Sequence, residues 1–214
     1  IEDFKSYPSS IKNDLKILMR IKKLDYVYIP KFKDIYENNK RSNIKIEKKY
    51  KILCAKFRKG HFEGVLDVMN RLTKLIKPKN IFMGKKDFQQ LLLIKYLANT
   101  YFPKTRIIDV DTVRDEKKIA LSSRLARLSK ESLSLTCIIY ETLQNMKQEL
   151  LKGTSFDKLK KESIEYLKSN DIHVEYLDVR SLITLEEETD KLKSCGIFIA
   201  CHIDGVRLID NIEI

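Results

Sequence analysis

Apolar residues recur at helical spacing in several parts of the chain, and these parts predict its helices. The first helix takes Ser9 or Ser10 as its N-cap and ends before Asp25, because its apolar side chains keep the 3.6-residue period. Its apolar positions are Ile11, Leu15, Leu18 and Met19. A second helix follows residues 60–64 and is broken by Pro78. Its apolar face carries Val65, Val68, Met69, Leu72 and Leu75.

Further helices are predicted downstream by the same criterion. One runs from Phe88 to about Asn99. A long helix begins after Ser129, whose hydroxyl suits an N-cap, and ends at Gly153. A shorter helix covers residues 156–168.

Short runs of apolar and β-branched residues predict the strands. A first strand over residues 26–30 is closed by a proline, residues 31–49 are irregular, and residues 50–57 form a second strand. The remaining strands are predicted over residues 81–83, 106–110, 173–179, 196–203 and 206–212. Asp204 and Gly205 separate the last two strands, which favours a two-residue hairpin.

The order of these elements predicts an α/β fold with two domains. The succession helix–strand–helix–strand, with strands apolar on both faces, is typical of a parallel sheet covered by helices, and we assign it to residues 1–112. Helices followed by antiparallel strands predict a smaller α+β domain over residues 113–214. Ligands of parallel sheets bind beyond the carboxyl ends of the strands, where Gly84 and the residues after Val110 lie.

A candidate anion site lies where the strand at residues 81–83 turns into a helix. Backbone N–H groups at a helix N-terminus stabilise an anion, and Lys85 and Lys86 add positive charge. Gly84 permits close approach of a ligand or a positive φ, and Asp87 can cap the helix or accept hydrogen bonds from ribose hydroxyls. The stretch therefore indicates a nucleotide phosphate site. An ordinary strand–turn–helix with two solvated lysines is the competing interpretation.

A second basic cluster that carries hydroxyl groups consists of Ser122, Ser123 and Arg124. If both clusters lie at the rim of one sheet, they can hold a triphosphate between them. The arginine would then supply bidentate contacts and the serines single hydrogen bonds. Taken alone, the second cluster is better explained as a polar loop between domains.

Composition narrows the class of protein. Hydrophobic residues make up 43% of the 214-residue chain, and no apolar run approaches the length of a membrane span, which predicts a soluble globular protein. The four cysteines form no CxxC pair and lie in apolar segments, so we interpret them as reduced, buried thiols of an intracellular protein. They are Cys54, Cys137, Cys195 and Cys201. A disulfide framework or a zinc site is not indicated.

The net charge of +12 leaves nucleic acid, anionic small substrates or a lysine-rich surface open. Residues 40–59 contain nine basic residues and one acidic residue, with Tyr50 and Phe57 interleaved as in single-strand binders. Because lysines also occur throughout the rest of the chain, we favour a solvated basic surface over a nucleic-acid patch.

Several motifs occur in an order and at a spacing that match one family. They are His61-Phe62-Glu63-Gly64-Val65, Phe82-Met83-Gly84-Lys85-Lys86-Asp87-Phe88-Gln89-Gln90, Val113-Arg114, Ala120-Leu121-Ser122-Ser123-Arg124 and Arg207-Leu208-Ile209-Asp210-Asn211-Ile212. Together they closely resemble the pantothenate synthetases (pantoate–β-alanine ligases). The likeness covers nearly the whole chain from about Glu2.

The resemblance implies an ATP-dependent ligase of the nucleotidyltransferase superfamily with a Rossmann-like N-terminal domain. Pantoate would attack the α-phosphate of ATP to give pantoyl adenylate and pyrophosphate. The amine of β-alanine would then displace AMP to form pantothenate. The resemblance also implies Mg²⁺, a homodimer and a cytoplasmic location.

Roles for individual residues follow from their positions in the family motifs. ATP binding is assigned to Gly84, Lys85, Lys86, Asp87, Val113, Leu121, Ser122, Ser123 and Arg124. Lys86 and Arg124 would be the catalytic side chains on the phosphates, Asp87 would contact ribose, and Val113 would contact adenine through its backbone. Gln90 would hold pantoate. No metal ligand is assigned, because Mg²⁺ is held mainly by phosphates and water.

The chain also departs from the family pattern. The family opens with a strand and a paired-histidine phosphate loop, whereas the histidines here stand singly and His61 is expected to be a structural residue at a helix start. The histidines are His61, His173 and His202. Substituted family positions are Asp111 for proline, Lys117 and Lys118 for an acidic residue and glycine, and Leu125 for asparagine.

The first residue, Ile1, is not a methionine, so we expect that the chain lacks the family's N-terminal segment. The isolated chain would then bind ATP weakly and synthesise little pantothenate. Two alternatives stay open: a non-catalytic or split-protein remnant that binds nucleotide or a partner, and a basic nucleic-acid-binding module.

Overall fold

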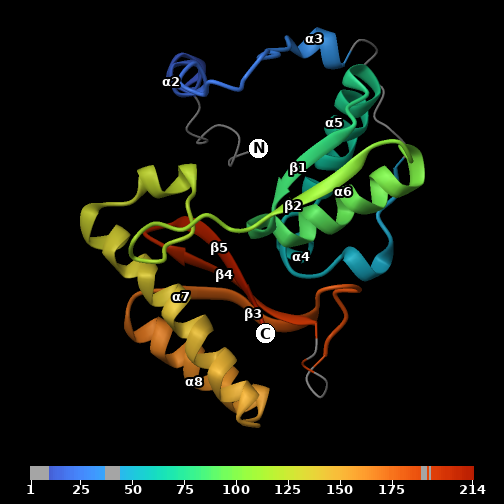
Figure 1. Ribbon diagram of the computed structural model, residues 1–214. Coiled ribbons are helices and arrows are strands. Elements are labelled where there is room, and N and C mark those ends of the chain that lie inside the picture. The colour runs from blue at the N-terminus through green and yellow to red at the C-terminus, as the bar shows by residue number, and fades with distance from the viewer. Residues whose placement is uncertain (1–9, 37–43, 189–191, 193) are drawn as a thin grey trace. The chain divides into compact units, whose positions relative to one another are not determined.

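The computed structural model describes residues 10–36, 44–188, 192 and 194–214 (Figure 1). The chain divides into two compact units, Ile1–Arg41 and Ser42–Ile214. The candidate site lies in the second unit.

The first unit contains helix α2 (Ile11–Leu18) and the short helix α3 (Phe32–Ile35). Ser10 caps α2 as predicted, because its hydroxyl accepts a hydrogen bond from the backbone N–H of Asn13. Ser9, the other candidate cap, lies outside the described residues.

The first helix ends at Leu18, before Asp25 as predicted, whereas the strand predicted over residues 26–30 is wrong. Tyr26 is 92% exposed, and no neighbouring strand within the described chain pairs with this segment. An apolar run becomes a strand only when another strand satisfies its backbone groups. Within residues 31–49, which were predicted to be irregular, α3 forms directly after Pro30.

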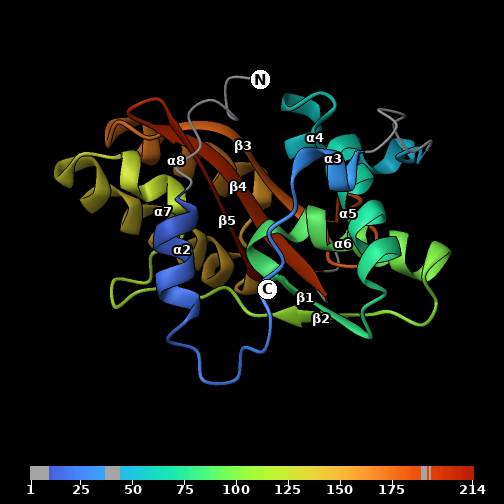
Figure 2. The ribbon, with the colours of Figure 1, turned by 90° about the horizontal axis from the view of Figure 1, so that it is seen from above.

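The second unit begins with a parallel-sheet lobe, residues 48–110. Helices α5 (His61–Ile76) and α6 (Phe88–Tyr101) alternate with strands β1 (Asn80–Gly84) and β2 (Arg106–Val110). The strands are parallel, with Asn80 opposite Arg106 and Gly84 opposite Val110 (Figure 2). The predicted parallel arrangement is therefore confirmed. The register places the carboxyl ends of both strands next to each other.

The strand predicted over residues 50–57 is wrong. The segment contains the 3₁₀ turn η1 (Lys48–Tyr50) and the short helix α4 (Cys54–Phe57). Tyr50, Leu53 and Cys54 are all buried in one core, whereas a strand would place Leu53 on the opposite face from Tyr50 and Cys54. Buried Tyr50 is also unavailable for stacking on a nucleic-acid base, which weakens the nucleic-acid hypothesis.

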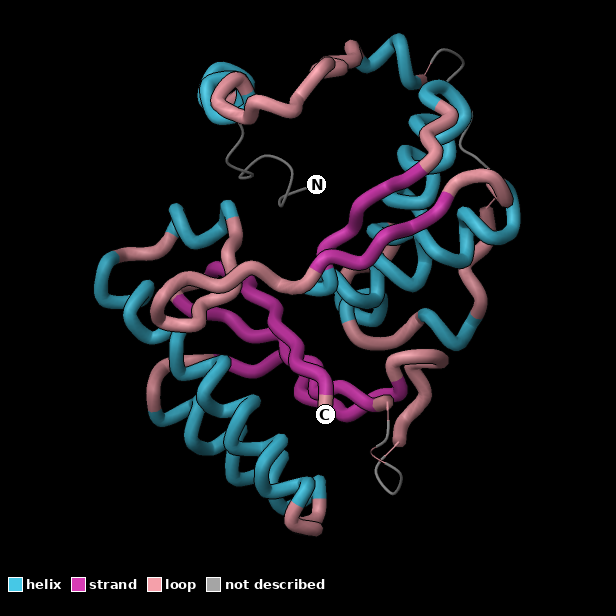
Figure 3. Tube along the Cα trace, viewed as in Figure 1, coloured by secondary structure: helices cyan, strands magenta, loops and turns pink. Residues whose placement is uncertain are grey.

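The antiparallel-sheet lobe, residues 130–213, consists of two helices and a three-stranded sheet. Helices α7 (Lys130–Leu151) and α8 (Phe156–Ser169) precede strands β3 (His173–Ser181), β4 (Cys195–Ile203) and β5 (Val206–Glu213), in the sheet order β3-β4-β5 (Figure 3). Ser129 caps α7 as predicted, since its hydroxyl accepts from the N–H of Ser132. Asp204 and Gly205, with φ of 48° and 68°, form the predicted two-residue hairpin turn.

Both faces of the three-stranded sheet are covered. Ile197 and Ile199 of β4 pack with α7 and α8, and Phe198 between them belongs to the core of the parallel-sheet lobe. The ring of Phe198 lies 5.5 Å from that of Phe88 at the start of α6. Alternate residues of one strand therefore join the two lobes. The division at residue 112 stays a prediction.

Removal of a side chain from the core under α7 should destabilise the protein strongly. Leu143 of α7 is fully buried among the sheet residues, so we expect Leu143→Ala to lower the free energy of unfolding by about 2–5 kcal/mol. Chemical denaturation followed by circular dichroism measures this change. Ile183→Ala serves as the control, because that side chain is 73% exposed and its loss should change the free energy by less than about 0.5 kcal/mol. Equal effects of the two substitutions would contradict the packing described.

Candidate functional site

The turn between β1 and α6 forms one side of the candidate site. Gly84 ends β1, residues Lys85–Asp87 make the 3₁₀ turn η2, and α6 begins at Phe88. Gly84 has a φ of −71°, so the positive φ that glycine permits is not used here. A Cβ at this position would meet no atom within 4 Å. Space for close approach of a ligand is therefore present in front of the turn.

Lys85 joins three elements. Its ammonium lies 2.9 Å from the carboxylate of Asp111, just after β2, and 3.0 Å from that of Glu213 in β5. The hydrogen bonds to these two carboxylates raise the pKa of Lys85. Its charge is thus balanced within the protein. A phosphate would have to compete with both carboxylates for this side chain.

Lys86 connects the turn to the second basic cluster. Its Nζ donates a hydrogen bond of 3.0 Å to the backbone carbonyl of Leu121. Burial lowers the pKa of Lys86; Asp87 and Asp210 oppose that shift, whereas the positive charges of Arg124 and Arg114 add to it. Lys86 therefore lies within electrostatic range of both arginines. The two basic clusters predicted from the sequence converge on one place.

The segment that carries Leu121 is folded back on itself. The N–H of Leu121 donates to the carbonyl of Val113 at 3.0 Å, and Arg114 and Ala120 form an antiparallel bridge. Val113 and Leu121 are more than half exposed. These two exposed apolar residues, joined through their backbones, provide a solvent-facing edge beside Lys86 that suits the face of a base.

Ser122 begins the 3₁₀ helix η3 (Ser123–Arg127). Its hydroxyl accepts a hydrogen bond of 3.2 Å from the backbone N–H of Arg124, which holds the cluster in a compact turn. Ser123 is exposed, and Arg124 is half-buried. The Ser122 cap thus constrains the backbone at Arg124.

Asp87 and Gln90 lie at the beginning of α6. Asp87 occupies the N-cap position but makes no side-chain capping hydrogen bond, so the predicted capping role is wrong and its exposed carboxylate is available to a ligand. Gln90 is half-buried and lines a small cavity of about 30 Å³. Gln89 is buried instead, and its amide donates to the carbonyls of Tyr50 and Ile52.

The cavity lies between α4, α5, α6 and β5, and has room for about one or two water molecules. His61, the first residue of α5 as expected, lines it, with its Nε2 2.8 Å from Nη1 of Arg58. Cys54 lies in the wall at 3.1 Å from the hydroxyl of Tyr176. Polar groups from both lobes therefore face this space beside Lys86.

Polar residues of β5 support the site, although no role was predicted for them from the sequence. Asp210 forms a bidentate pair with Arg114, at 2.7 and 2.8 Å. The guanidinium of Arg114 also lies over the ring of Tyr140 in α7, 4.1 Å from its centre. The signal in the sequence was the pair Asp210-Asn211 inside an otherwise apolar strand. Buried polar residues at such positions require specific partners.

The described part of the chain offers neither a metal cage nor a membrane span. Within it, no group of three or more histidine, cysteine or acidic side chains is arranged to hold a metal ion. No helix among the described residues combines the length and the apolar character that a membrane crossing requires.

Comparisons with known proteins agree in one family. The family described as "Pantoate-beta-alanine ligase" matches residues 1–213. The pantothenate synthetase of Leptospira interrogans serogroup Icterohaemorrhagiae serovar copenhageni (strain Fiocruz L1-130) is 37% identical over 216 residues, which span 100% of this chain and 75% of that protein. The pantothenate synthetase of Marinomonas sp. (strain MWYL1) is 31% identical, and the match covers 99% of this chain and 76% of that protein.

Solved structures give the same result. Pantothenate synthetase from Thermus thermophilus superposes with a TM-score of 0.91 at 28% identity, covering 99% of this chain and 77% of that one. Pantoate-beta-alanine ligase from Francisella tularensis, solved in complex with beta-gamma ATP and beta-alanine, gives a TM-score of 0.76 at 31% identity and covers 99% of this chain and 73% of that one. The motifs, the fold and these matches agree: the chain belongs to the pantoate–β-alanine ligase family.

Proposed function

We propose that the protein condenses pantoate with β-alanine at the expense of ATP, and that the reaction takes place around Lys86. The observation that carries the assignment is the hydrogen bond from Lys86 to the Leu121 carbonyl, because it brings the two basic clusters to one site. Membership of the ligase family and the ATP and β-alanine named for the Francisella tularensis structure support it.

The reaction proceeds in two steps. A carboxylate oxygen of pantoate forms a bond to the α-phosphorus of ATP, the bond from that phosphorus to the bridging oxygen breaks, and pyrophosphate leaves with the electron pair. The amine of β-alanine then attacks the acyl carbon, loses a proton and displaces AMP. The products are pantothenate, AMP and pyrophosphate. Negative charge grows on the phosphate oxygens in the first step, so correctly placed cations lower its barrier.

Lys86 and Arg124 supply these cations. Lys86 binds a phosphate oxygen in exchange for the Leu121 carbonyl, and Arg124 approaches from η3 with a planar pair of donors that suits a phosphate. Ser122 and Ser123 add single hydrogen bonds. Lys85 contributes through its backbone, because two carboxylates already hold its side chain.

The remaining assigned residues place the other parts of the substrates. The exposed carboxylate of Asp87 accepts hydrogen bonds from ribose, and the edge formed by Val113 and Leu121 receives adenine. Gln90, which lines the wall of the small cavity, holds pantoate through its side-chain amide, which orients a hydroxyl and a carboxylate without neutralising either. Gly84 leaves the space through which the phosphates approach the turn.

Mg²⁺ is expected to arrive with ATP. The carboxylate of Asp210 is occupied by Arg114, and that of Asp111 by Lys85, so the described residues here offer no all-protein cage. Mg²⁺ usually takes its oxygen ligands from substrate phosphates and water, which agrees with this set of side chains. When bound, it would neutralise phosphate charge. A homodimer and a cytoplasmic location are further proposals that follow from the family resemblance.

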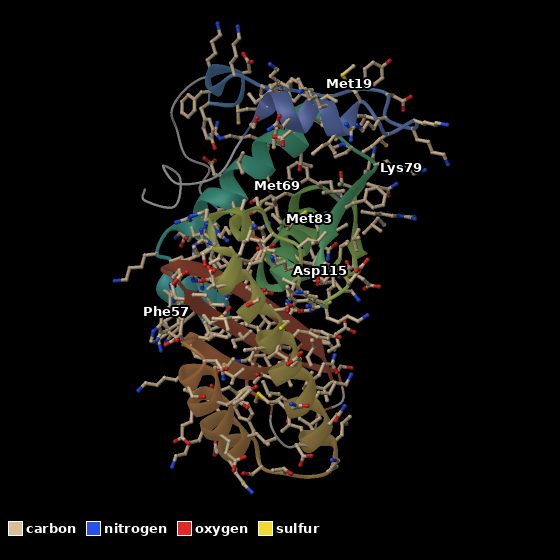
Figure 4. The ribbon with its side chains drawn as sticks, turned by 90° about the vertical axis from the view of Figure 1, so that its left-hand side faces the viewer. Met19, Phe57, Met69, Lys79, Met83 and Asp115 are labelled. Atoms are coloured by element: carbon tan, nitrogen blue, oxygen red, sulfur yellow. The ribbon has the colours of Figure 1, made fainter. Side chains whose placement is uncertain are left out.

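Lys86→Ala and Arg124→Ala should each reduce pantoate-dependent exchange of labelled pyrophosphate into ATP by roughly 10²–10³-fold, because each removes a cation from the charge that develops on phosphate. Lys79→Ala is the matched control. Lys79 precedes β1, whereas the site lies at the opposite end of that strand, beyond Met83 (Figure 4). This control should exchange like the unaltered protein.

Two other exchange results would contradict the proposal. A non-catalytic nucleotide-binding protein would bind ATP but show no pantoate-dependent exchange in any variant. Exchange that is insensitive to both Lys86→Ala and Arg124→Ala would show that the site has been placed wrongly.

The affinity for ATP should depend on the protonation of Lys86. Because burial lowers the pKa of Lys86, its ammonium loses its proton at a lower pH than an ordinary lysine does. ATP affinity, measured by calorimetric titration, should therefore fall as the pH rises. The decline should begin at a pH at which ordinary lysines are still protonated. In Lys86→Arg the decline should move to higher pH, because a guanidinium stays protonated. Identical pH profiles of the two proteins would contradict a phosphate role for this ammonium.

A further inference from the structure

Asn211 of β5 holds the turn that precedes α6. Its side-chain amide donates hydrogen bonds to the backbone carbonyls of Lys85, at 3.1 Å, and Lys86, at 2.9 Å. Asn211 is 8% exposed, so water has little access with which to replace these bonds. One carboxamide from the antiparallel-sheet lobe thus satisfies two consecutive carbonyls of the parallel-sheet lobe.

We propose that Asn211 is a positioning residue for the nucleotide site, acting on ATP through the backbone of Lys85 and Lys86 without contacting it. The proposal rests on the proposed function, in which the phosphates of ATP bind at this turn. The proposal gives β5 a part in substrate binding. The residue types in the motif at residues 207–212 do not indicate such a part by themselves.

The orientation of the peptide groups gives the physical reason. In a trans peptide the C=O and N–H groups point in opposite directions. Because Asn211 holds the carbonyls of Lys85 and Lys86 towards β5, the N–H groups of Lys86 and Asp87 point away from β5. That side is the one available to an anion at the beginning of α6. Loss of the amide donors would free both peptide planes to rotate.

Asn211 is itself held on both sides of its backbone. Its N–H donates to Oδ1 of Asp210 at 2.8 Å, and its carbonyl accepts from Nη2 of Arg114 at 3.2 Å. Since Arg114 also binds Asp210 with two hydrogen bonds and rests on Tyr140, this strand segment has little freedom. The carboxamide is therefore presented to the turn in a fixed orientation.

Side chains on the two faces of β5 allow the positioning role to be tested separately from general stability. Asn211 and Glu213 point to the turn, where Glu213 also contacts Lys85. Leu208, on the alternate face, belongs to the core under α7 and α8. Leu208→Ala therefore weakens the same strand without touching the turn, and it is the matched control.

Asn211→Ala removes both donors, and Asn211→Asp replaces them with a carboxylate that faces two carbonyl oxygens. We expect the dissociation constant of a non-hydrolysable ATP analogue to rise roughly tenfold or more in each, the loss of about one net hydrogen bond to a fixed turn. The KM for pantoate should stay unchanged. Leu208→Ala should lower the melting temperature and leave the dissociation constant of the analogue as it was.

A second measurement does not require nucleotide. Acetylation of Lys86 by limiting acetic anhydride, followed over pH by mass spectrometry, reports the environment of its ammonium. Because burial lowers the pKa of Lys86, a loosened turn in Asn211→Ala should move the midpoint of labelling to higher pH. Lys79 is the internal reference, and Leu208→Ala should leave the midpoint in place.

The two measurements distinguish failure of the inference from failure of the proposed function. If the unaltered protein binds no ATP analogue but Asn211→Ala shifts the labelling of Lys86, Asn211 positions the turn as inferred, and what fails is the proposed function, which makes ATP the ligand of that turn. If the analogue binds and neither its dissociation constant nor the labelling changes in Asn211→Ala, the inference is overturned. It is also overturned if Leu208→Ala reproduces both effects, since the role of Asn211 would then be structural alone.

Discussion

The bidentate pair between Arg114 and Asp210 is the interaction on which the rest of the site depends. Both side chains are largely buried, and the pair joins the segment after β2 to β5. A buried ion pair contributes little net stability when desolvation is counted, but it is intolerant of altered geometry. Its effect here is to fix the register between two segments that are distant in sequence. Lys86, Leu121 and Asn211 then meet where a nucleotide can lie.

The alternation of side chains along the antiparallel strands builds the connection between the two lobes. In β4, Ile197 and Ile199 are buried under α7 and α8, while Phe198 reaches Phe88 at the start of α6. In β5 the same alternation sends Asp210 to Arg114 and Asn211 to the turn before α6. One sheet thus serves as the packing surface of its own helices and as the support of the turn that we propose to bind phosphate.

Structural features that depend on local chemistry were predictable from the sequence. Features that depend on a distant partner were not. The Asp204-Gly205 turn and the Ser129 cap depend on nearby residues, and the structure has them as predicted. Residues 26–30 and 50–57 were assigned as strands on their apolar character, but a strand also needs a neighbour to bond with. The convergence of Lys86 with Leu121 followed from motif order. The support by Asn211 depends on pairing across 125 residues of chain, which no local pattern reveals.

The two-sided burial of β4 has a consequence for the evolution and engineering of this protein. A strand with no solvent face can accept few polar substitutions, and at Gly196 an added Cβ would lie 2.9 Å from Cδ2 of Leu182 and 3.1 Å from the backbone oxygen of Ile212, so its neighbours would have to shift. Sequence drift should therefore concentrate in the helices and spare this strand. A fragment cut between the lobes would expose the Phe198 face to water and promote aggregation. In engineered chimaeras the two lobes should therefore be transferred together.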